Sequence, residues 1–376
     1  MYIRALRATS NGTDHSYNSV SLPTSQLKSF VVIPAWLKSF KKSAIRTFIL
    51  HIFAFSQLQI KMAFTPSSLP SLTGKIYVVT GGNTGIGRYT VQHLAEHGAR
   101  IYLGARSESK ANAAITEIKR IVPSADINFL QINLMDLKTV AVAAAEFKNK
   151  ETELHGLVNN AGIMATPFEK TKDNYEAQWQ TNYLSHWLLT YLLLPTLLST
   201  AAAPGAKPGD VRVVNLTSNG HNFAPSAGIN FADIDLVKGG IWSRYGQSKL
   251  GNILHAKTLA KLYGPNGTSD EGKGIWTASV HPGSINTQLN ERTSSPLKML
   301  QPVLQALGVY STADEGSYSS LFAVASQDFK ESDVGGYFVP TAKKGKPSKK
   351  AGNEKLAEEL WSWSEKEMRG KGFIDA

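Results

Sequence analysis

The segment KIYVVTGGNTGIG, residues 75–87, joins a short β-branched apolar run to a turn rich in glycine. The run at 75–82 has the composition and length of a buried strand, and residues 83–99 place apolar side chains at helical spacing. Gly98 supplies a stop signal for that helix. A strand, a glycine-rich turn and a helix in this order indicate a βα unit of the kind that binds dinucleotides.

The turn carries glycines at Gly81, Gly85 and Gly87, in the arrangement T-G-x-x-x-G-x-G. Gly81 allows the tight turn, Gly85 lets the backbone approach a pyrophosphate, and Gly87 permits close packing of the helix. The amino end of the helix then faces the anion, and Ile86 within the turn is expected to contact the same ligand. A glycine-rich turn is sometimes only a loop, but its place between a strand and a helix favours the binding interpretation.

Strand and helix patterns alternate along the next part of the chain. Strands are predicted at 100–106, 127–134 and 154–162, and helices at 107–122 and 136–150. The strands are nearly continuous apolar runs, which indicates a parallel sheet covered on both faces with right-handed crossovers. We therefore expect an α/β fold, a single doubly wound Rossmann domain with a mostly parallel seven-stranded sheet flanked by helices.

Further motifs follow the glycine turn in the order NNAG at 159–162, VVNLTS at 213–218, YGQSK at 245–249 and HPGSINT at 281–287. Together with TGGNTGIG they resemble the signatures of the short-chain dehydrogenase/reductase family. The insertion GINFADIDL before the tyrosine motif is similar to the branch that contains retinol dehydrogenases, WW-domain oxidoreductases and many fungal reductases. The resemblance implies that Asn160, Ile285 and Thr287, within these motifs, contact the cofactor.

The resemblance also implies a chemical role for the tyrosine motif. Tyr245 and Lys249 lie four positions apart, so on a helix they share one face. The Lys249 ammonium is expected to lower the pKa of Tyr245 from about 10, so that the phenol is the general acid or base of the reaction. In the family this lysine also holds the nicotinamide ribose. Ser218, rather than Thr217, matches the serine that polarises the substrate carbonyl, and Asn182 matches the asparagine that supports a proton-relay water.

The end of the second predicted strand indicates which nicotinamide cofactor binds. NAD enzymes usually carry an acidic residue there for the ribose 2′-hydroxyl, but this chain has Ala105 followed by Arg106. Arg88 follows the glycine turn directly, and two guanidinium groups suit the 2′-phosphate of NADP(H). We therefore expect NADP(H) as the cofactor. The family usually has an Asp near the adenine after the third strand; the aligned residue is Asn133, and Asp136 is the alternative contact.

Composition excludes several other classes of function. The chain has 376 residues, of which 42% are hydrophobic and 18% charged, as in a folded globular protein. The absence of cysteine excludes disulfides, thiolate catalysis and cysteine zinc sites, and the nine histidines form no HExxH motif, so no metal site is expected. Residues 1–62 carry eight Lys and Arg against the single acid Asp14, so they contribute +7 of the net charge of +11. That distribution argues against a nucleic-acid-binding domain.

Residues 1–62 are expected to be a basic extension outside the domain. Their apolar run at 45–55 is short for a transmembrane span and lies too far along the chain for a signal-peptide core. A disordered extension, a mitochondrial-type targeting segment, a membrane-surface helix and a gene-model artefact with a start at Met62 all stay open. We expect the NADP-binding Rossmann domain at 70–365 and a C-terminal tail at 366–376. The expected location is cytoplasmic, or mitochondrial or membrane-associated if the extension is present in the mature protein.

The substrate pocket is expected between the loop after Ser218, the insertion at 222–244 and the stretch after Thr287. Apolar and aromatic side chains dominate there, which suits a lipophilic ketone, aldehyde or alcohol. The expected lining residues are His221, Phe223, Trp242, Leu289, Met299, Leu300 and Tyr310. The amphipathic helix predicted at 353–368 is expected to pack near the rim of this pocket.

The leading hypothesis is an NADP(H)-dependent oxidoreductase that interconverts a lipophilic ketone or aldehyde and its alcohol. One alternative is a non-catalytic cofactor-binding or scaffold protein on the same fold, and another is a membrane-associated enzyme similar to retinol or steroid dehydrogenases. The expected partner is a small lipophilic carbonyl compound or alcohol, and no nucleic acid is expected. Weak membrane association through residues 45–60 and homo-oligomer formation stay open.

Overall fold

The computed structural model describes residues 64–283, 285 and 311–375, and they are built around an eight-stranded sheet in the order β3-β2-β1-β4-β5-β6-β7-β8. The predicted extension 1–62 lies outside the described residues. The strands are β1 Ile76–Thr80, β2 Arg100–Ala105, β3 Asp126–Gln131, β4 Gly156–Asn159, β5 Arg212–Leu216, β6 Trp276–Val280, β7 Gly336–Val339 and β8 Lys343–Lys344. Strands β1 to β7 pair in parallel, and β8 pairs antiparallel with β7. The mostly parallel sheet is confirmed, while the eighth strand was not predicted because two exposed lysines carry no strand signature.

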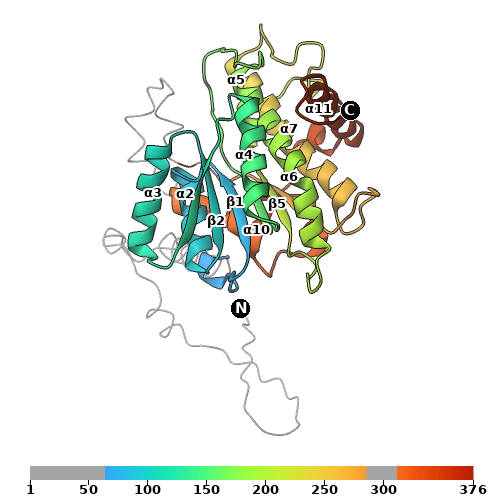
Figure 1. Cartoon of the computed structure of the whole chain (residues 1–376). Coiled ribbons are helices and arrows are strands. Elements are labelled where there is room, and N and C mark those ends of the chain that lie inside the picture. Colours follow the sequence, from blue (N-terminus) through green and yellow to red (C-terminus); the bar gives the residue numbers. More distant parts are fainter. Residues whose placement is uncertain (1–63, 284, 286–310, 376) are drawn as a thin grey trace, which may run out of the picture. The chain divides into compact units, whose positions relative to one another are not determined.

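Helices cover both faces of the sheet because its central strands are apolar on both sides. Along β1, Ile76 and Val78 pack into one core, and Tyr77 and Val79 pack into the other. The first core includes α4, α6, α7 and α11, and the second includes α2, α3 and α10; Figure 1 shows α4, α6 and α7 on one side of the sheet. Their bounds are α2 Gly85–Glu96, α3 Glu108–Ile121, α4 Leu137–Lys150, α6 Ser185–Ala201, α7 Ile241–Tyr263, α10 Ala313–Ala325 and α11 Glu354–Gly370.

The strand order fixes where a ligand site can form. The chain runs outward from β1 to β2 and β3, and then returns to place β4 on the other side of β1. The crossovers on the two sides of β1 therefore diverge, and they leave a crevice outside the carboxyl ends of β1 and β4. The glycine turn and the NNAG motif follow these two strand ends, so the motifs predicted to bind the cofactor meet at the crevice.

The start of α3 brings polar groups to the same edge of the sheet. Ser107 caps this helix, and its hydroxyl accepts a hydrogen bond from the backbone N–H of Lys110 at 3.4 Å. The cap follows β2 directly, so Arg106, Ser107 and Lys110 stand together at a strand end and a helix amino terminus. Such a position favours negatively charged ligands.

The C-terminal helix α11 packs against the outer face of α6 and α7 (Figure 1). The Trp361 ring lies 5.2 Å from Trp187, and the Trp363 ring lies 5.8 Å from Trp179. The predicted helix is thus present, but it lies in the core of this face, and its residues are not among the described residues that line the pocket considered below. The predicted domain end at 365 falls inside this helix, which continues to Gly370 because its last turn still buries apolar side chains.

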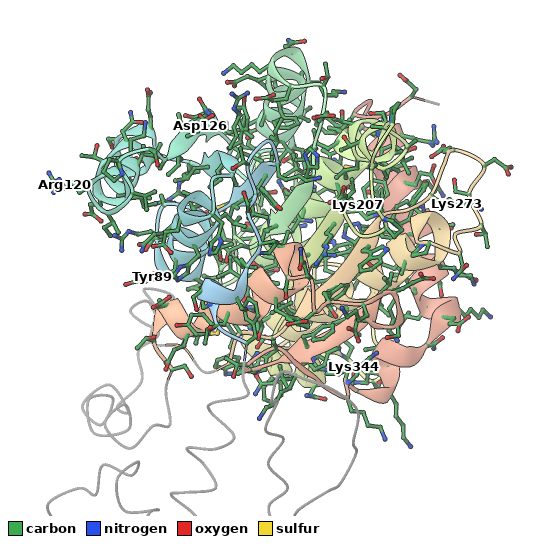
Figure 2. All side chains as sticks on the ribbon, turned by 90° about the horizontal axis from the view of Figure 1, so that it is seen from below. Tyr89, Arg120, Asp126, Lys207, Lys273 and Lys344 are labelled. Carbon is green, nitrogen blue, oxygen red and sulfur yellow. The ribbon has the colours of Figure 1, made fainter. Side chains whose placement is uncertain are left out.

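Charged side chains stand at the outer edge of the described domain. Arg120 lies at the outer edge of the domain in Figure 2, and Arg120, Asp126, Lys207, Lys273 and Lys344 are all exposed. None of the helices within the described ranges is long and apolar enough to cross a bilayer.

Replacing Met368 by Ala tests whether the last turn of α11 belongs to the core. Met368 is 0% exposed, so its truncation should lower the free energy of unfolding by about 2–5 kcal/mol. The exposed Glu359 on the same helix is the matched control, and Glu359→Ala should change stability by less than about 0.5 kcal/mol. Urea unfolding measures both. Equal midpoints for the two variants would show that 366–376 is a dispensable tail.

Candidate active site

A cleft of about 530 Å³ opens at the carboxyl ends of the central strands. Its walls come from the glycine turn after β1, the start of α3, the loop after β3, the NNAG loop after β4, the end of β5 and one face of α7. This is the crevice that the strand order predicts. Most of the predicted cofactor residues within the described ranges lie on its walls: Gly81, Gly85, Ile86, Gly87, Arg106, Asn133, Asn160, Tyr245 and Lys249.

The glycine turn lies against the NNAG loop so closely that side chains do not fit. Gly81 and Gly85 have φ of 66° and 54°, the left-handed region that favours glycine. A Cβ on Gly87 would lie 2.3 Å from the Gly81 carbonyl oxygen and 2.5 Å from the Asn160 amide nitrogen. The turn therefore presents bare backbone at the start of α2, as an anion site requires.

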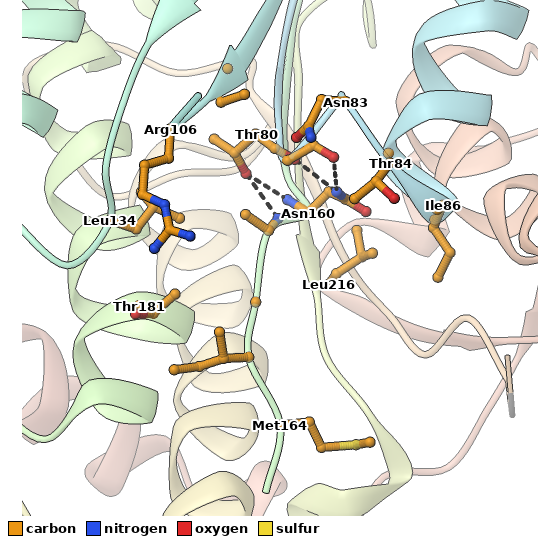
Figure 3. A pocket seen from close by; sticks show the side chains of 18 of the residues that line it. Thr80, Asn83, Thr84, Ile86, Arg106, Leu134, Asn160, Met164, Thr181 and Leu216 are labelled. Atoms are coloured by element: carbon orange, nitrogen blue, oxygen red, sulfur yellow. Dashed lines mark hydrogen bonds between the residues drawn. The ribbon is translucent and has the colours of Figure 1, made fainter. Parts of the chain in front are cut away.

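Thr80 and Asn160 tie the two loops together. The Thr80 hydroxyl accepts hydrogen bonds from the backbone N–H groups of Asn160 at 2.9 Å and Ala161 at 3.0 Å. The Asn160 side-chain amide donates back to the Thr80 carbonyl at 2.7 Å (Figure 3). Asn160 lines the cleft, but its amide is used to hold the glycine turn in place.

Tyr245 and Lys249 share one face of α7, as their spacing predicts. Both are buried, at 7% and 5% exposure, and the Lys249 Nζ lies 5.8 Å from the centroid of the Tyr245 ring. The same Nζ donates to the Leu216 carbonyl at 3.0 Å, which provides this buried cation with an acceptor at the end of β5. The two side chains and the strand end therefore form one constellation.

Burial controls the ionisation of this pair. Burial raises the pKa of Tyr245 to about 12, because a buried phenolate loses its hydration. The hydrogen bond with the Ser218 hydroxyl has the smaller, opposite effect of lowering this pKa. Burial also lowers the pKa of Lys249 to about 8. The net pKa of Tyr245 is therefore raised and not lowered as predicted, because desolvation is the largest influence on it. Tyr245 holds its proton at neutral pH.

Ser218 and Thr217 follow β5, and the structure separates their roles. The Thr217 hydroxyl is buried and donates to the Lys249 backbone carbonyl at 2.6 Å, so it fixes α7 to the sheet. Ser218 is half-buried and accepts from the Gly220 N–H at 3.0 Å. A Cβ on Gly220 would lie 2.7 Å from the Tyr245 ring and 3.3 Å from the Ser218 hydroxyl oxygen, so the glycine lets these two side chains approach each other.

Asn182 lies in a π-helical turn, Gln180–Leu184, immediately before α6. Its side chain accepts from the Ile163 N–H at 2.8 Å and donates to the Ile163 carbonyl at 2.9 Å. It also donates to the Ser248 hydroxyl at 2.9 Å, and Ser248 in turn donates to the Tyr245 carbonyl at 2.8 Å. Ser248 was missed as a site residue, although it stands inside the quoted YGQSK motif. The Asn182 side chain thus braces the tyrosine helix against the loop after β4.

The end of the cleft next to α3, which we call its polar end, carries positively charged side chains. It differs from the prediction in that Arg88 does not line it. Arg106 lines the cleft, and its side chain lies beside Leu134 in Figure 3. Arg88 is not among the described residues that line it, because its guanidinium pairs with Glu117 of α3 at 3.3 Å. Lys110 lines the cleft instead and was missed. The signal was its place three residues after the helix cap, which puts it on the first turn of α3 next to Arg106.

Asn133 and Asp136 were the two alternatives for the adenine contact, and they face different surroundings. Asn133 lines the cleft, and its side-chain oxygen accepts from the Met135 N–H at 3.3 Å. Asp136 pairs with Lys172 at 2.7 Å, and this pairing holds the pKa of its carboxyl below the usual value. The geometry favours Asn133.

The predicted substrate residues divide into three groups. Phe223 and Trp242 are exposed, with ring centroids 6.1 Å apart, and Trp242 lies edge-on to Tyr245 at 6.3 Å. His221 is buried, and its ring bonds the Ser218 carbonyl and the Ser348 N–H, so it supports the serine loop and is not among the described residues that line the cleft. The third group lies outside the described residues: Leu289, Met299, Leu300 and Tyr310. Of the two cofactor contacts predicted in the same region, Ile285 is buried after β6 and Thr287 lies outside the described residues.

Over residues 64–283, 285 and 311–375, no group of three or more histidine or carboxylate side chains could hold a metal ion.

The chain is similar to known proteins in sequence and in fold. A family profile described as short chain dehydrogenase matches residues 75–298. A short-chain dehydrogenase/reductase from Aspergillus calidoustus, drtF, is 58% identical over 310 residues, which cover 82% of this chain and 98% of that protein. Human retinol dehydrogenase 12 is 36% identical over 296 residues, covering 78% of this chain and 86% of that protein. The solved structure of an uncharacterized protein from Mycobacterium paratuberculosis has a TM-score of 0.61 at 26% identity, covering 82% and 98% of the two chains.

Gly87→Ala should disturb the cleft because the added methyl group overlaps the Gly81 backbone of the same turn and the Asn160 amide of the facing loop. Overpacking of this kind costs about 1–3 kcal/mol, so we expect a lower urea midpoint together with loss of dinucleotide binding. Gly352→Ala is the matched control, since a Cβ there meets no atom within 4 Å. If Gly87→Ala bound dinucleotides as tightly as Gly352→Ala, the close approach of the two loops would be unimportant for the site.

Proposed function

The chain belongs to the short-chain dehydrogenase/reductase family and to its retinol dehydrogenase-like branch, and we propose that it is an NADP(H)-dependent oxidoreductase interconverting a lipophilic ketone or aldehyde and its alcohol. The family uses NAD(P) as its cofactor. The observation that carries the proposal is the convergence of Ser218, Tyr245 and Lys249 beside a backbone-lined dinucleotide cleft.

The cleft fits a nicotinamide dinucleotide. The bare glycine turn at the start of α2 suits a pyrophosphate, because a side chain on Gly87 would fill the space next to the NNAG loop. Asn133 would hold the adenine end, and Lys249 would hold the nicotinamide ribose. When bound, the nicotinamide supplies or accepts the hydride.

The preference for NADP(H) rests on the polar end of the cleft. Arg106 and Lys110 offer two cations beside the amino end of α3, and Ser107 adds a hydroxyl. A 2′-phosphate accepts charge-assisted hydrogen bonds from such groups, whereas a 2′-hydroxyl gains little from them. Ala105 stands where an NAD enzyme usually has an acid.

Tyr245 is the proton donor in the direction of reduction. With a pKa near 12 it keeps its proton at neutral pH, and the Ser218 hydroxyl beside it helps to bind the carbonyl oxygen that receives the proton. Lys249, whose pKa is about 8, is mostly an ammonium at pH 7. A positive charge at this distance stabilises the phenolate that forms when the proton leaves.

The apolar character of the substrate is supported by the rim of the cleft. Trp242 and Phe223 expose aromatic surface next to Tyr245, and Met164 and Ile163 line the cleft below the NNAG loop. Such a lining favours a lipophilic molecule over a charged one. Trp242 stands edge-on to the proton donor, so it is placed to contact the carbons next to the reacting carbonyl.

Tyr245→Phe tests the proton donor. Turnover should fall by about 10²–10⁴-fold, since only the acid is lost, while NADPH affinity should change little. The matched control is Tyr263→Phe at the far end of the same helix, where the hydroxyl bonds Glu271. The measurement is NADPH oxidation with a panel of lipophilic ketones and aldehydes. A parent that binds NADPH but turns over no member of a broad panel would favour the scaffold alternative.

Arg106→Ala and Lys110→Ala test the cofactor preference. The parent should bind NADPH at least about tenfold more tightly than NADH, and each substitution should weaken NADPH by about tenfold with NADH little changed. Arg88→Ala is the control, because the Arg88 guanidinium pairs with Glu117 of α3 and Arg88 is not among the described residues that line the cleft. Fluorescence titration at fixed salt gives each dissociation constant. Equal parent affinities for the two cofactors would overturn the NADP(H) assignment.

A further inference from the structure

His186 is a buried histidine that none of the predicted motifs includes. It lies in the first turn of α6 with 1% exposure, and each of its ring nitrogens has a partner. Nδ1 lies 3.0 Å from the Asn182 backbone oxygen, and Nε2 lies 2.9 Å from the Thr80 hydroxyl oxygen. A carbonyl only accepts, so Nδ1 carries the hydrogen and Nε2 accepts from Thr80. The contacts therefore select one neutral tautomer.

The surroundings keep this ring uncharged. Burial lowers the pKa of His186 to about 4, and the charge of Lys249 acts in the same direction. A neutral ring has one donor and one acceptor, whereas an imidazolium has two donors and would face the Thr80 hydroxyl with the wrong polarity. The ring is suited to joining an acceptor on one side to a donor on the other.

The hydrogen bonds from Thr80 to His186 and from His186 to Asn182 form a link between two parts of the site. At one end of this link, Thr80 lies between the two loops that are proposed to bind the cofactor. The Thr80 hydroxyl accepts from the backbone N–H groups of Asn160 and Ala161, so its own hydrogen is free for His186. A looser contact from Thr80 to the Val158 carbonyl, at 3.4 Å, is the weaker alternative. The bond to His186 thus completes the hydrogen bonding of the residue that aligns the glycine turn with the NNAG loop.

At the other end of this link, Asn182 lies next to the helix that carries Tyr245. The Asn182 side chain contacts Ile163 and Ser248, and the His186 ring donates to the backbone carbonyl of the same residue. Asn182 lies in the π-helical turn Gln180–Leu184, so this bond joins the His186 ring to that turn. Through Ser248, this turn is bonded to the Tyr245 carbonyl.

We propose that His186 is a positioning residue that sets the spacing between the cofactor-binding loops at Thr80 and the Asn182 turn that braces the Tyr245 helix. This inference rests on the proposed function, because it concerns how the cofactor and the proton donor are aligned for hydride transfer. His186 touches neither substrate nor cofactor; it acts through Thr80 and Asn182.

Two amide variants separate the ends of the link. Asn has its amide near the position of Nδ1, so His186→Asn should keep the bond to Asn182 and lose the bond to Thr80. Gln reaches the position of Nε2, so His186→Gln should keep Thr80 and lose Asn182. His186→Leu removes both bonds. We expect His186→Asn to weaken NADPH binding about tenfold with turnover nearly kept, and His186→Gln to slow turnover about tenfold with NADPH binding nearly kept.

The matched control is His255, another fully buried histidine, whose Nδ1 bonds Asn215 behind the site. His255→Asn should lower the melting temperature without the opposite changes in affinity and turnover. NADPH titration, single-turnover kinetics and thermal unfolding are measured for all the variants. If His186→Asn and His186→Gln changed affinity and turnover in parallel, or only lowered the melting temperature as His255→Asn does, the positioning role would be overturned.

A spectroscopic measurement tests the link without catalysis. Nitrogen-15 NMR of the histidine rings should show an Nδ1–H tautomer that stays neutral down to about pH 5, and this signal should be missing from His186→Asn. A His186 ring that titrates near pH 6.5, or that carries its hydrogen on Nε2, would overturn the inference whether or not the enzyme turns over. A parent that shows the expected tautomer but reduces no carbonyl would refute the proposed function alone.

Discussion

The close approach of two backbone loops, one after β1 and one after β4, is the constraint on which the site depends. Gly87 permits that approach, since any side chain there would meet the Gly81 carbonyl and the Asn160 amide. Thr80 then joins the loops through its hydroxyl and its carbonyl. Parallel strands bring their carboxyl ends to one edge of the sheet. The contact between the two loops therefore determines where the start of α2, the end of β2 and the end of β5 face each other.

The face of α7 that carries Tyr245 and Lys249 is costly for the protein to bury, and the surrounding contacts show how the cost is limited. Lys249 gives up most of its hydration, and its ammonium is bonded to the Leu216 carbonyl at the end of β5. The Thr217 hydroxyl holds the lysine backbone from the same strand end. The desolvation that raises the pKa of Tyr245 also strengthens the effect of nearby charges on it. A constellation of this kind is useful for proton transfer and would be unfavourable as a purely structural core.

The sequence predicted the layers, the parallel sheet and the motifs around the cleft because these depend on local patterns. Long-range pairing could not be predicted in the same way. Arg88 follows the glycine turn in the sequence, but the rotation of α2 directs it to Glu117, and the first turn of α3 brings Lys110 to the cleft. Similarly, Asp136 forms an ion pair with Lys172, and the His221 ring accepts a hydrogen bond from the Ser348 backbone N–H. No short sequence motif encodes the approach of the loops that carry these residues.

Helix α11 supports the site through the aromatic core behind the cleft, although its residues are not among the described residues that line the cleft. Tyr183, next to Asn182, points away from the cleft, and its hydroxyl bonds Ser364 of α11 at 2.7 Å. Gly251 lets α7 approach the same ring, since a Cβ there would lie 2.8 Å from it. The π-helical turn is therefore held from behind by α7 and α11 and from the front by the contacts of Asn182. The rotation of this turn sets the direction of Asn182, so packing on the outer face of the domain contributes directly to the geometry of Tyr245, the proposed proton donor.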